Sequence, residues 1–238
     1  MNQLPDSASP IIAFENVSFN HAERALHGIS FSVYAGRVTV LIGPRHSGKT
    51  TVLRMLLGLD IPDGGRISVC GRPIDASTAS TTAVSVIPET VPHPSYCSAG
   101  TYLRWKALWA GTSNVLLDDI VRMTGLRDLL PVKLRDLDMT GIVKMRFAIA
   151  LLTDPKALIV DEPLRALDKA GVQWVCGQMR RQADRGVAML VASEPDYRLK
   201  PITDDVVMLD RGTVEKEGSL SQLQSETAKL SPDGVSSL

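Results

Sequence analysis

The stretch that most constrains this chain is an eight-residue loop, Gly43-Pro44-Arg45-His46-Ser47-Gly48-Lys49-Thr50, which lies between an apolar run at 38–42 and a helix-like segment at 51–57. It matches the pattern G-x-x-x-x-G-K-[ST] in the strand-then-helix setting that a phosphate-binding loop requires. Glycines let backbone N–H groups curl around phosphate oxygens, and the positive end of the following helix faces the same anion. The sequence therefore predicts a nucleoside triphosphate site.

The motif predicts roles for single residues of this loop, which is called the phosphate loop (43–50) below. Lys49 is expected to reach the outer phosphates, and the Thr50 hydroxyl to hold a Mg²⁺ ion that bridges two of them. The candidate nucleotide-binding residues are the eight residues of the loop and Thr51. The alternative is a glycine-containing turn between a strand and a helix that binds nothing, which the spacing and the setting disfavour.

The charge balance narrows the classes of partner. The 238 residues include 26 basic and 26 acidic side chains, so the net charge is about zero, which provides no electrostatic footprint for nucleic acid and no polybasic membrane patch. The three cysteines, Cys70, Cys97 and Cys176, lack metal-ligand spacing and suit reduced thiols in a cytosolic protein. No apolar run approaches the ~20 residues that span a bilayer, and the first seven residues do not form a signal-peptide pattern. We therefore expect no nucleic-acid partner, and a membrane-spanning part would come from another chain.

Strand and helix patterns alternate along most of the chain. Continuous apolar runs at 38–42, 157–160 and 187–192 predict strands covered on both faces, and the helix patterns between them predict an α/β core with a mostly parallel sheet. Strand patterns at 11–19 and 29–33, and a hairpin at 206–217, predict an antiparallel β edge. The predicted organisation is a flexible arm (1–10), an α/β core (11–87 and 156–220), an inserted α-helical subdomain (88–155) and a flexible tail (221–238).

The helical subdomain contains three aromatic residues at near-helical spacing. We interpret Tyr102, Trp105 and Trp109 as packing residues, and a surface that contacts a partner is the alternative. The last helix of this region is expected to bury one face, because apolar residues follow the i, i+3, i+4, i+7 pattern from Met145 to Leu152.

A carboxylate at the end of an apolar strand is the partner that a phosphate loop needs, because Mg²⁺ must be held from the protein side. Asp161 follows the run at 157–160 and fills that position. Glu162 is placed to orient or deprotonate an attacking water. Alone, Asp-Glu-Pro at 161–163 could be a strand-ending turn, but together with the phosphate loop it predicts a metal-dependent hydrolytic site.

These features together resemble the nucleotide-binding subunit of ABC transporters. The resemblance rests on the phosphate loop, the inserted helical region, Ala-Leu-Ile-Val-Asp-Glu-Pro at 157–163 and Arg-Ala-Leu-Asp at 165–168, and covers about residues 11–223. It implies a P-loop NTPase core of the RecA-like kind that binds ATP and Mg²⁺. In that family two subunits pair head to tail around two ATP molecules and drive membrane-spanning partners. Asp168 would then lie in the D-loop, at the interface between the two subunits.

Two family positions near the nucleotide are changed in this chain. After the first strand the family stacks an aromatic ring on adenine, and His21 stands at the matching place, so weaker stacking is expected. The family's Q-loop follows a strand with a Gln that helps to coordinate Mg²⁺ and senses the membrane partner. Glu89 replaces that Gln. A carboxylate still ligates Mg²⁺, so the resemblance implies an altered metal contact.

The family signature, Leu-Ser-Gly-Gly-Gln, is also degraded. Counting back without gaps from Asp154-Pro155, the matching residues are Leu-Asp-Met-Thr-Gly at 137–141, so that Asp138, Met139 and Thr140 replace Ser and both Gly. An alternative alignment places Met-Thr-Gly on Leu-Ser-Gly but needs compensating gaps. In the family this loop offers a hydroxyl and N–H groups to the γ-phosphate of the other subunit. A carboxylate there would set like charges against each other.

The last changed position belongs to the catalytic site. In the family a switch His follows a strand-ending Ser and contacts the γ-phosphate and the attacking water. Here Ser193 is followed by Glu194, which offers no cation at that place. Loss of such a group is expected to slow hydrolysis by about 10²-fold.

The resemblance therefore implies an ATP-binding subunit of an ABC transporter that hydrolyses ATP slowly or only with help from a partner. We expect a multi-span membrane permease as partner, a second ATP-binding subunit with a heterodimer favoured over a homodimer, and a location on the cytoplasmic face of the cell membrane. Export is favoured over import, because 126–137 resembles small exporter subunits. The alternatives are a non-hydrolysing regulatory or scaffold subunit, and a soluble ABC-type ATPase of translation or DNA repair. The sequence does not identify the cargo.

Overall fold

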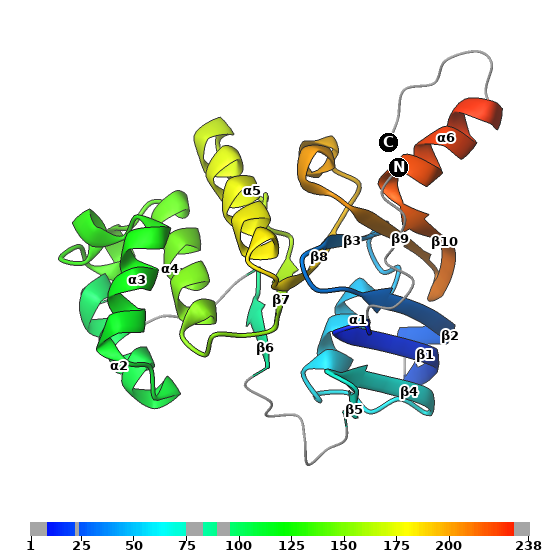
Figure 1. The fold of residues 1–238 in the computed structure, drawn as a ribbon, viewed down its shortest axis with the longest axis horizontal. Helices are drawn as coiled ribbons and strands as arrows, with labels where there is room; N and C mark the ends of the chain where they lie inside the picture. Colours follow the sequence, from blue (N-terminus) through cyan, green and yellow to red (C-terminus); the bar gives the residue numbers. More distant parts are fainter. Residues whose placement is uncertain (1–8, 22–23, 75–82, 90–95, 231–238) are drawn as a thin grey trace.

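A six-stranded sheet forms the centre of the chain (Figure 1). The computed structural model describes residues 9–21, 24–74, 83–89 and 96–230. The strand order is β10-β9-β3-β8-β7-β6, in which the pairs from β9 to β6 are parallel and β10 pairs antiparallel with β9. The strands are β3 (Val38–Ile42), β6 (Val84–Ile87), β7 (Ala157–Asp161), β8 (Ala188–Ser193), β9 (Asp205–Asp210) and β10 (Thr213–Ser219). The predicted mostly parallel α/β core is confirmed.

A second, antiparallel sheet has the order β2-β1-β4-β5. Its strands are β1 (Ile12–His21), β2 (Arg24–Val33), β4 (Gly64–Val69) and β5 (Arg72–Pro73). Phe14 and Phe31 stand opposite each other across β1 and β2, with their rings stacked 4.5 Å apart, a cross-strand aromatic pair that stabilises the register. The predicted antiparallel β edge is therefore present as a separate sheet and as the β9–β10 hairpin.

Side chains of the central strands alternate between two apolar cores, because successive residues of a strand point to opposite faces. In β3, Val38 and Val40 enter one core and Leu41 enters the other. The first core contains residues of α5 (Lys169–Asp184) and of the helical region. The second contains residues of α1 (Lys49–Leu56) together with strands of the antiparallel sheet. Helix α1 thus lies between the two sheets, which holds the phosphate loop rigidly at its N-terminal end.

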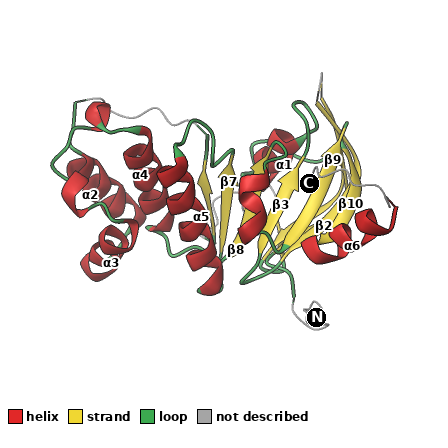
Figure 2. Cartoon of the chain, turned by 90° about the horizontal axis from the view of Figure 1, so that it is seen from above, coloured by secondary structure: helices red, strands yellow, loops and turns green. Residues whose placement is uncertain are grey.

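The helical region lies at one end of the molecule, and the two sheets lie at the other (Figure 2). Its described elements are α2 (Ala99–Ala110), α3 (Asn114–Thr124), the 3-10 turns η1 (Arg127–Leu129) and η2 (Leu134–Asp136), and α4 (Met139–Leu151). Ser98, Ser113 and Asp138 cap the three α-helices with side-chain oxygens that accept backbone N–H bonds. The described secondary structure of this region therefore consists of helices and 3-10 turns between residues 99 and 151.

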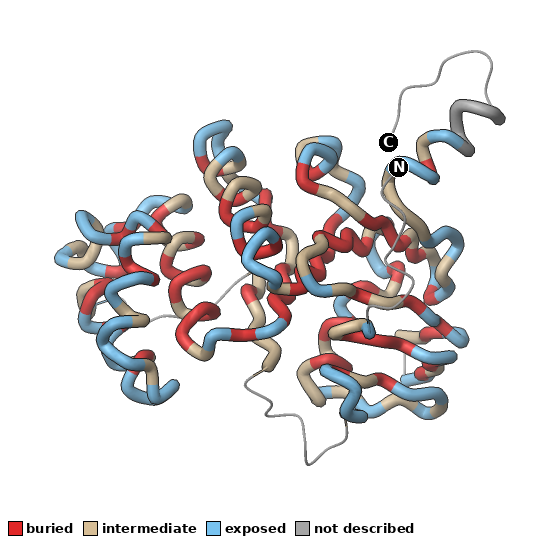
Figure 3. Tube along the Cα trace, in the orientation of Figure 1, coloured by how far each residue is buried: buried red, intermediate tan, exposed pale blue. Residues whose placement is uncertain are grey.

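The interpretation of the aromatic residues of α2 as packing residues is wrong for two of the three. Tyr102 is buried at 7% exposure, whereas Trp105 is 48% and Trp109 79% exposed. Figure 3 shows α2 buried on one side only. At 3.6 residues per turn, positions 102, 105 and 109 lie within about 60° of one another. This narrow arc lies at the border of the side that carries the buried residues of α2, so the spacing alone did not decide which rings are buried.

The prediction of a flexible tail from residue 221 does not match the structure, because α6 spans Leu220–Leu230. The Ser219 hydroxyl accepts the backbone N–H of Gln222 at 3.3 Å, and the Gln222 side chain accepts that of Ser219 at 3.1 Å. This reciprocal pair is a capping box, and Leu223 is buried at 9% exposure. The remaining element is the 3-10 helix η3 (Tyr197–Ile202). The predicted arm up to residue 8 and the tail from 231 lie outside the described residues. Within the described ranges, no helix combines the length and apolar character that a bilayer crossing demands.

Candidate nucleotide-binding site

The predicted site residues come from loops that meet at one edge of the central sheet. Ile42 pairs with Ser193 and Ala192 pairs with Asp161 in the parallel ladder. The phosphate loop after β3, Glu194 after β8 and the 161–163 segment at the end of β7 therefore share the carboxyl edge of the strands. Ile87 pairs with Val160, which brings the segment containing Glu89 to the same edge. Ligands bind at this edge in open α/β sheets.

The backbone of the phosphate loop requires its two glycines. A Cβ atom at Gly43 would lie 2.1 Å from the carbonyl oxygen of Leu209 and 2.5 Å from Ser47 Oγ, so no side chain fits there. Gly48 has φ of 112° and directly precedes α1, which begins at Lys49. Thr50 is exposed and Thr51 is buried. The loop thus presents the N-terminal N–H groups of α1 and the Thr50 hydroxyl at the edge of the sheet, a donor arrangement that suits phosphate.

The Lys49 ammonium is held inside the curl of the loop. Its Nζ atom donates to the carbonyl oxygens of Gly43 at 2.7 Å and Pro44 at 2.9 Å, and the residue is 8% exposed. Burial lowers the pKa of Lys49, while the negative charges of Glu162, Glu194 and Asp161 oppose that shift. The side chain is therefore a positive charge fixed between the loop and the carboxylates.

The carboxylates at the end of β7 are crowded. Burial, followed by the nearby charges of Glu162 and Glu89, raises the pKa of Asp161 to about 6. Burial also raises the pKa of Glu162. Glu162 adopts a φ of 44°, a conformation that is rare for residues with a side chain and often found at functional sites. One of its carboxylate oxygens, Oε1, accepts the backbone N–H of Glu194 at 3.0 Å, which orients the group.

This donor set fits Mg²⁺. A half-buried carboxylate whose pKa is raised by burial and by its acidic neighbours is a place where a divalent cation restores charge balance. Mg²⁺ is held by one or two protein oxygens together with phosphate oxygens and water, and Thr50 and Asp161 would be those protein ligands. Among the described residues, no three His, Cys, Asp or Glu side chains form a metal site on their own. When bound, the ion would neutralise the charge of the phosphate chain.

Two arginine–glutamate pairs connect loops of the site. Arg45 Nε lies 2.8 Å from Glu194 Oε1 and joins the phosphate loop to the segment after β8. Arg165 pairs with the Glu89 carboxylate, and Arg146 donates to the Glu89 backbone carbonyl at 2.6 Å. Arg45 holds the pKa of Glu194 below its usual range. Each of the two carboxylates therefore has a guanidinium partner within the chain.

The comparison with known families decides what kind of site this is. A family model described as ABC transporter matches residues 26–165, more than half of the chain. The chain belongs to the ABC transporter family. The ATPase domains of this family bind ATP with Mg²⁺ and hydrolyse it, and the chain is the ATP-binding subunit of a transporter with a membrane partner.

Curated relatives and solved structures agree with this assignment. An uncharacterised ABC transporter ATP-binding protein of Bacillus subtilis, YhcH, is 29% identical over 208 residues, covering 85% of this chain and 68% of that protein. A Nod factor export ATP-binding protein I of Burkholderia lata is 28% identical over 214 residues, covering 87% and 70%. The fold is similar to that of an ATP-binding cassette of an ABC transporter in its ADP conformation, with a TM-score of 0.83, 20% identity and coverage of 94% and 96%. These similarities support the P-loop NTPase fold.

In this ABC subunit, two of the four residues predicted for the interface between subunits, Asp138 and Asp168, act as helix caps. Asp138 Oδ1 accepts the N–H of Gly141 at 2.6 Å at the start of α4, and Asp168 Oδ1 accepts that of Gly171 at 2.7 Å at the start of α5. Met139 is 41% exposed. A Cβ at Gly171 would lie 2.9 Å from Thr140 Oγ1, so the two helix starts are neighbours. An interface role for Asp138, Met139, Thr140 and Asp168 stays a prediction.

Two histidines of this ABC subunit belong to the predicted nucleotide contacts. His46, in the phosphate loop, adopts φ of 64°, which is strained for a residue with a side chain. His21 is exposed at the end of β1, and its ring centre lies 6.3 Å from that of Phe19. A contact of His21 with adenine stays a prediction.

Reasoning from the sequence missed the arginines of the site. Arg45 was assigned only as part of the phosphate loop, and Arg165 only as part of the Arg-Ala-Leu-Asp stretch. A signal was available in the sequence. Arg45 and Arg165 each lie in a loop of the site, and Glu89 and Glu194 introduce carboxylates where the family has Gln and His, so ion pairs between them were possible. The pairs join positions 149 and 76 residues apart, and only the fold shows which arginine meets which carboxylate.

The raised pKa of Asp161 predicts a cost to stability when no metal is present. Replacing Asp161 by Asn is expected to raise the free energy of unfolding at pH 7.5 in EDTA. A pKa of about 6 against an ordinary 3.8 corresponds to about 3 kcal/mol, which partial exposure reduces to about 1–2 kcal/mol. Because the folded-state pKa is raised, the wild-type carboxylate loses stability as the pH rises from about 4 to about 6. Urea unfolding at pH 4 and pH 7.5 measures this.

The gain should be much smaller at pH 4, where position 161 is neutral in the folded forms of both proteins. Asp119→Asn is the control, because Asp119 lies on the surface of α3 with its side chain 51% exposed. A variant at Asp161 that is no more stable than the wild type at pH 7.5 would contradict the buried-charge interpretation.

Proposed function

We propose that this subunit binds ATP with Mg²⁺ at the phosphate loop and Asp161, and that it hydrolyses ATP slowly or only when a different ATP-binding subunit completes the site. The observation that carries the proposal is the placement of a carboxylate, Glu194, at the switch position, 2.8 Å from Arg45. The groups that bind phosphate are present in this chain, and Glu162 is oriented by the Glu194 backbone. The groups that would complete hydrolysis are those that differ from the family.

The start of α4 supports a heterodimer. The signature loop precedes this helix, whose positive end would face the γ-phosphate bound by the other subunit. Asp138 places a carboxylate at that end, and its cap bond with Gly141 holds it there. An anion at a helix N-terminus offsets the field that favours phosphate. In a homodimer this would occur at both sites, whereas a partner with an intact signature would complete the site at Lys49.

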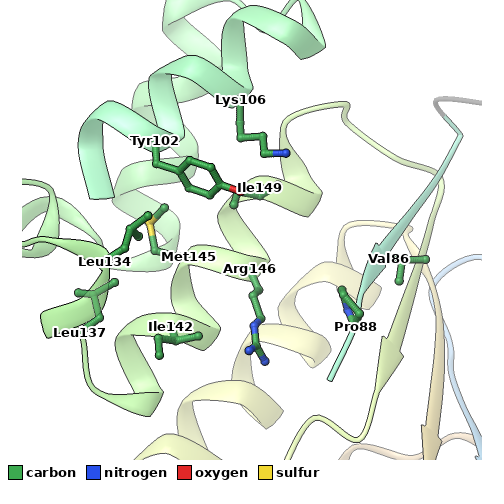
Figure 4. Close-up of a pocket in the computed structure, with 10 residues that line it drawn as sticks. All are labelled: Val86, Pro88, Tyr102, Lys106, Leu134, Leu137, Ile142, Met145, Arg146 and Ile149. Carbon is green, nitrogen blue, oxygen red and sulfur yellow. The ribbon is translucent and has the colours of Figure 1, made fainter. Parts of the chain in front are cut away.

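A groove beside the Q-loop supports docking of the membrane partner. A cavity of about 90 Å³ lies between α2, α4 and the end of β6, and is lined mainly by apolar side chains such as Val86, Pro88 and Ile149 (Figure 4). Glu89, at the position that senses the partner, directly follows Pro88. A segment of the permease that entered this groove would act on the Glu89–Arg165 pair. In the proposed complex the subunit lies against the cytoplasmic side of the membrane partner.

The names of relatives favour export. Several relatives are named Nod factor export ATP-binding protein I, among them those of Burkholderia lata and Paraburkholderia xenovorans. The fold is also similar to that of a bacterial exporter with ATP bound, with a TM-score of 0.74. We therefore propose an exporter, with the cargo selected by the permease.

The experiment that tests this proposal is ATP turnover by the purified chain. We expect the chain alone to turn over far more slowly than about 1–10 s⁻¹, a rate typical of enzymes, because Glu194 and Asp138 oppose the closed state. The Glu162→Gln variant sets the background. A rate in that typical range, absent from Glu162→Gln, would contradict impaired hydrolysis.

A non-hydrolysing scaffold subunit is the second candidate. The observation that favours it is the Arg45–Glu194 pair, because it gives the residue at the switch position a partner within the chain. In that case ATP would hold the shape of the complex, and Glu162 would be dispensable while Lys49 would not.

A further inference from the structure

Arg45 stands at a point of the phosphate loop from which it reaches the catalytic side of the site. It directly follows Pro44, whose carbonyl oxygen accepts Lys49 Nζ at 2.9 Å. Its own Nε atom lies 2.8 Å from Glu194 Oε1, and the Glu194 backbone N–H is bound to Glu162 at 3.0 Å. A series of contacts therefore links Arg45, through Pro44, to the lysine that is expected to bind the outer phosphates, and, through Glu194, to the carboxylate that is expected to orient water.

The surroundings of Arg45 are strongly charged. A cavity of about 240 Å³ is lined by three arginines, Arg45, Arg165 and Arg198, and by acidic residues that include Glu162 and Glu194. Without the arginines, the carboxylates would repel a triphosphate at this edge of the sheet. Of these three arginines, Arg45 is the one that belongs to the phosphate loop.

We propose that Arg45 binds the γ-phosphate of the nucleoside triphosphate and gives up Glu194 to do so. The proposal rests on the nucleotide binding proposed above and names a residue for one phosphate. In the proposed complex, Arg45 of the phosphate loop supplies the cation at the γ-phosphate that Glu194, at the switch position after β8, does not offer.

The exchange is favourable for two physical reasons. The Arg45 and Glu194 side chains are 70% and 48% exposed, and ion pairs at exposed positions contribute little. A terminal phosphate carries a charge of about −2 and several acceptor oxygens, whereas Glu194 carries one negative charge. The planar guanidinium fork also matches a phosphate geometrically. The ion pair thus keeps Arg45 in place and yields to a stronger anion.

The test compares the affinities for ATP and ADP, each with Mg²⁺, by isothermal titration calorimetry. Arg45→Ala is expected to weaken ATP binding by about tenfold, the loss typical of one charge-assisted hydrogen bond, and to change ADP binding less than about twofold. Glu194→Gln is expected to tighten ATP binding, because it removes a competitor and a repelling charge. The double variant should bind ATP more tightly than Arg45→Ala alone.

Arg122→Ala is the matched control, since Arg122 is 71% exposed and pairs with Asp119 on α3, away from the site; both affinities should be unchanged. Arg45→Lys, which keeps the charge but not the fork, should fall between wild type and Arg45→Ala. Unchanged or tighter ATP binding by Arg45→Ala would overturn the proposal. The Arg45–Glu194 ion pair would then only join the phosphate loop to the segment after β8. An equal loss for ATP and ADP would overturn it as well. A wild-type chain that binds neither nucleotide would instead contradict the proposed nucleotide site.

Discussion

Replacing Lys49 by alanine is expected to lower the affinity for ATP by about 10²-fold or more. Lys49 is a nearly buried ammonium, and its Nζ atom is held by the carbonyls of Gly43 and Pro44 at the centre of the phosphate loop. A buried charge that binds an oppositely charged ligand is worth about 2–5 kcal/mol. Calorimetry with ATP and Mg²⁺ measures the loss, and thermal unfolding checks it, because a ligand at 100 times its Kd adds about 2.7 kcal/mol of stability.

The fold should survive this substitution, because desolvation of Lys49 already works against its charged form. Melting temperatures without nucleotide should therefore agree within a few degrees. An alanine variant that keeps wild-type affinity would contradict the role of the loop.

Glu162→Gln is the matched variant for deciding between an ATPase and a scaffold. It keeps the shape of the side chain and removes the carboxylate that would act on water. If transport in cells is lost with both variants, hydrolysis is required. If it survives Glu162→Gln but not Lys49→Ala, the scaffold function is supported.

Replacing Glu194 by histidine is expected to raise the ATP turnover of the subunit by about 10²-fold. The substitution removes a negative charge from the place where charge develops on the γ-phosphate and adds a donor there, and such preorganised groups are worth about 10²–10³-fold in rate. It also frees Arg45 from its ion pair. Turnover is measured with the partner subunit present, so that the second signature does not limit the rate.

Glu194→Gln separates the two contributions, because it removes the charge without adding an imidazole. We expect it to raise the rate less than the histidine variant does. A histidine variant that is no faster than the wild type would show that the limit lies elsewhere, and Asp138 would then be the next position to change.

Much of the fold followed from patterns of single segments. Strands β3, β7 and β8 were visible as continuous apolar runs, since strands with two covered faces need apolar residues at nearly every position. The phosphate loop was recognisable because Gly43 and Gly48 serve a backbone path that no other residue allows. Helix α6 was missed although its capping box, Ser219 with Gln222, is a local signal, because the Ser-rich composition around it indicated a loop.

The exposed aromatic residues of α2 show what the periodicity of a sequence does not predict, namely which side chains of a helix are buried. The spacing of Tyr102, Trp105 and Trp109 identified a helix, but burial depends on what packs against each face. Only the placement of α4 and the loop at 129–134 against α2 leaves Trp109 at 79% exposure.

The sequence by itself determined the α/β class, the nucleotide loop and the acidic residues that lie near it, because each is written in a short stretch whose chemistry is local. Only the tertiary structure decided how the altered positions combine. From the sequence, Glu194 was expected to offer no cation at the switch position. The fold brings the cation of Arg45 to 2.8 Å from it, and it brings Arg165 to Glu89. Electrostatic pairing depends on distance in space, and the register of parallel strands, which joins loops far apart in the chain, sets those distances.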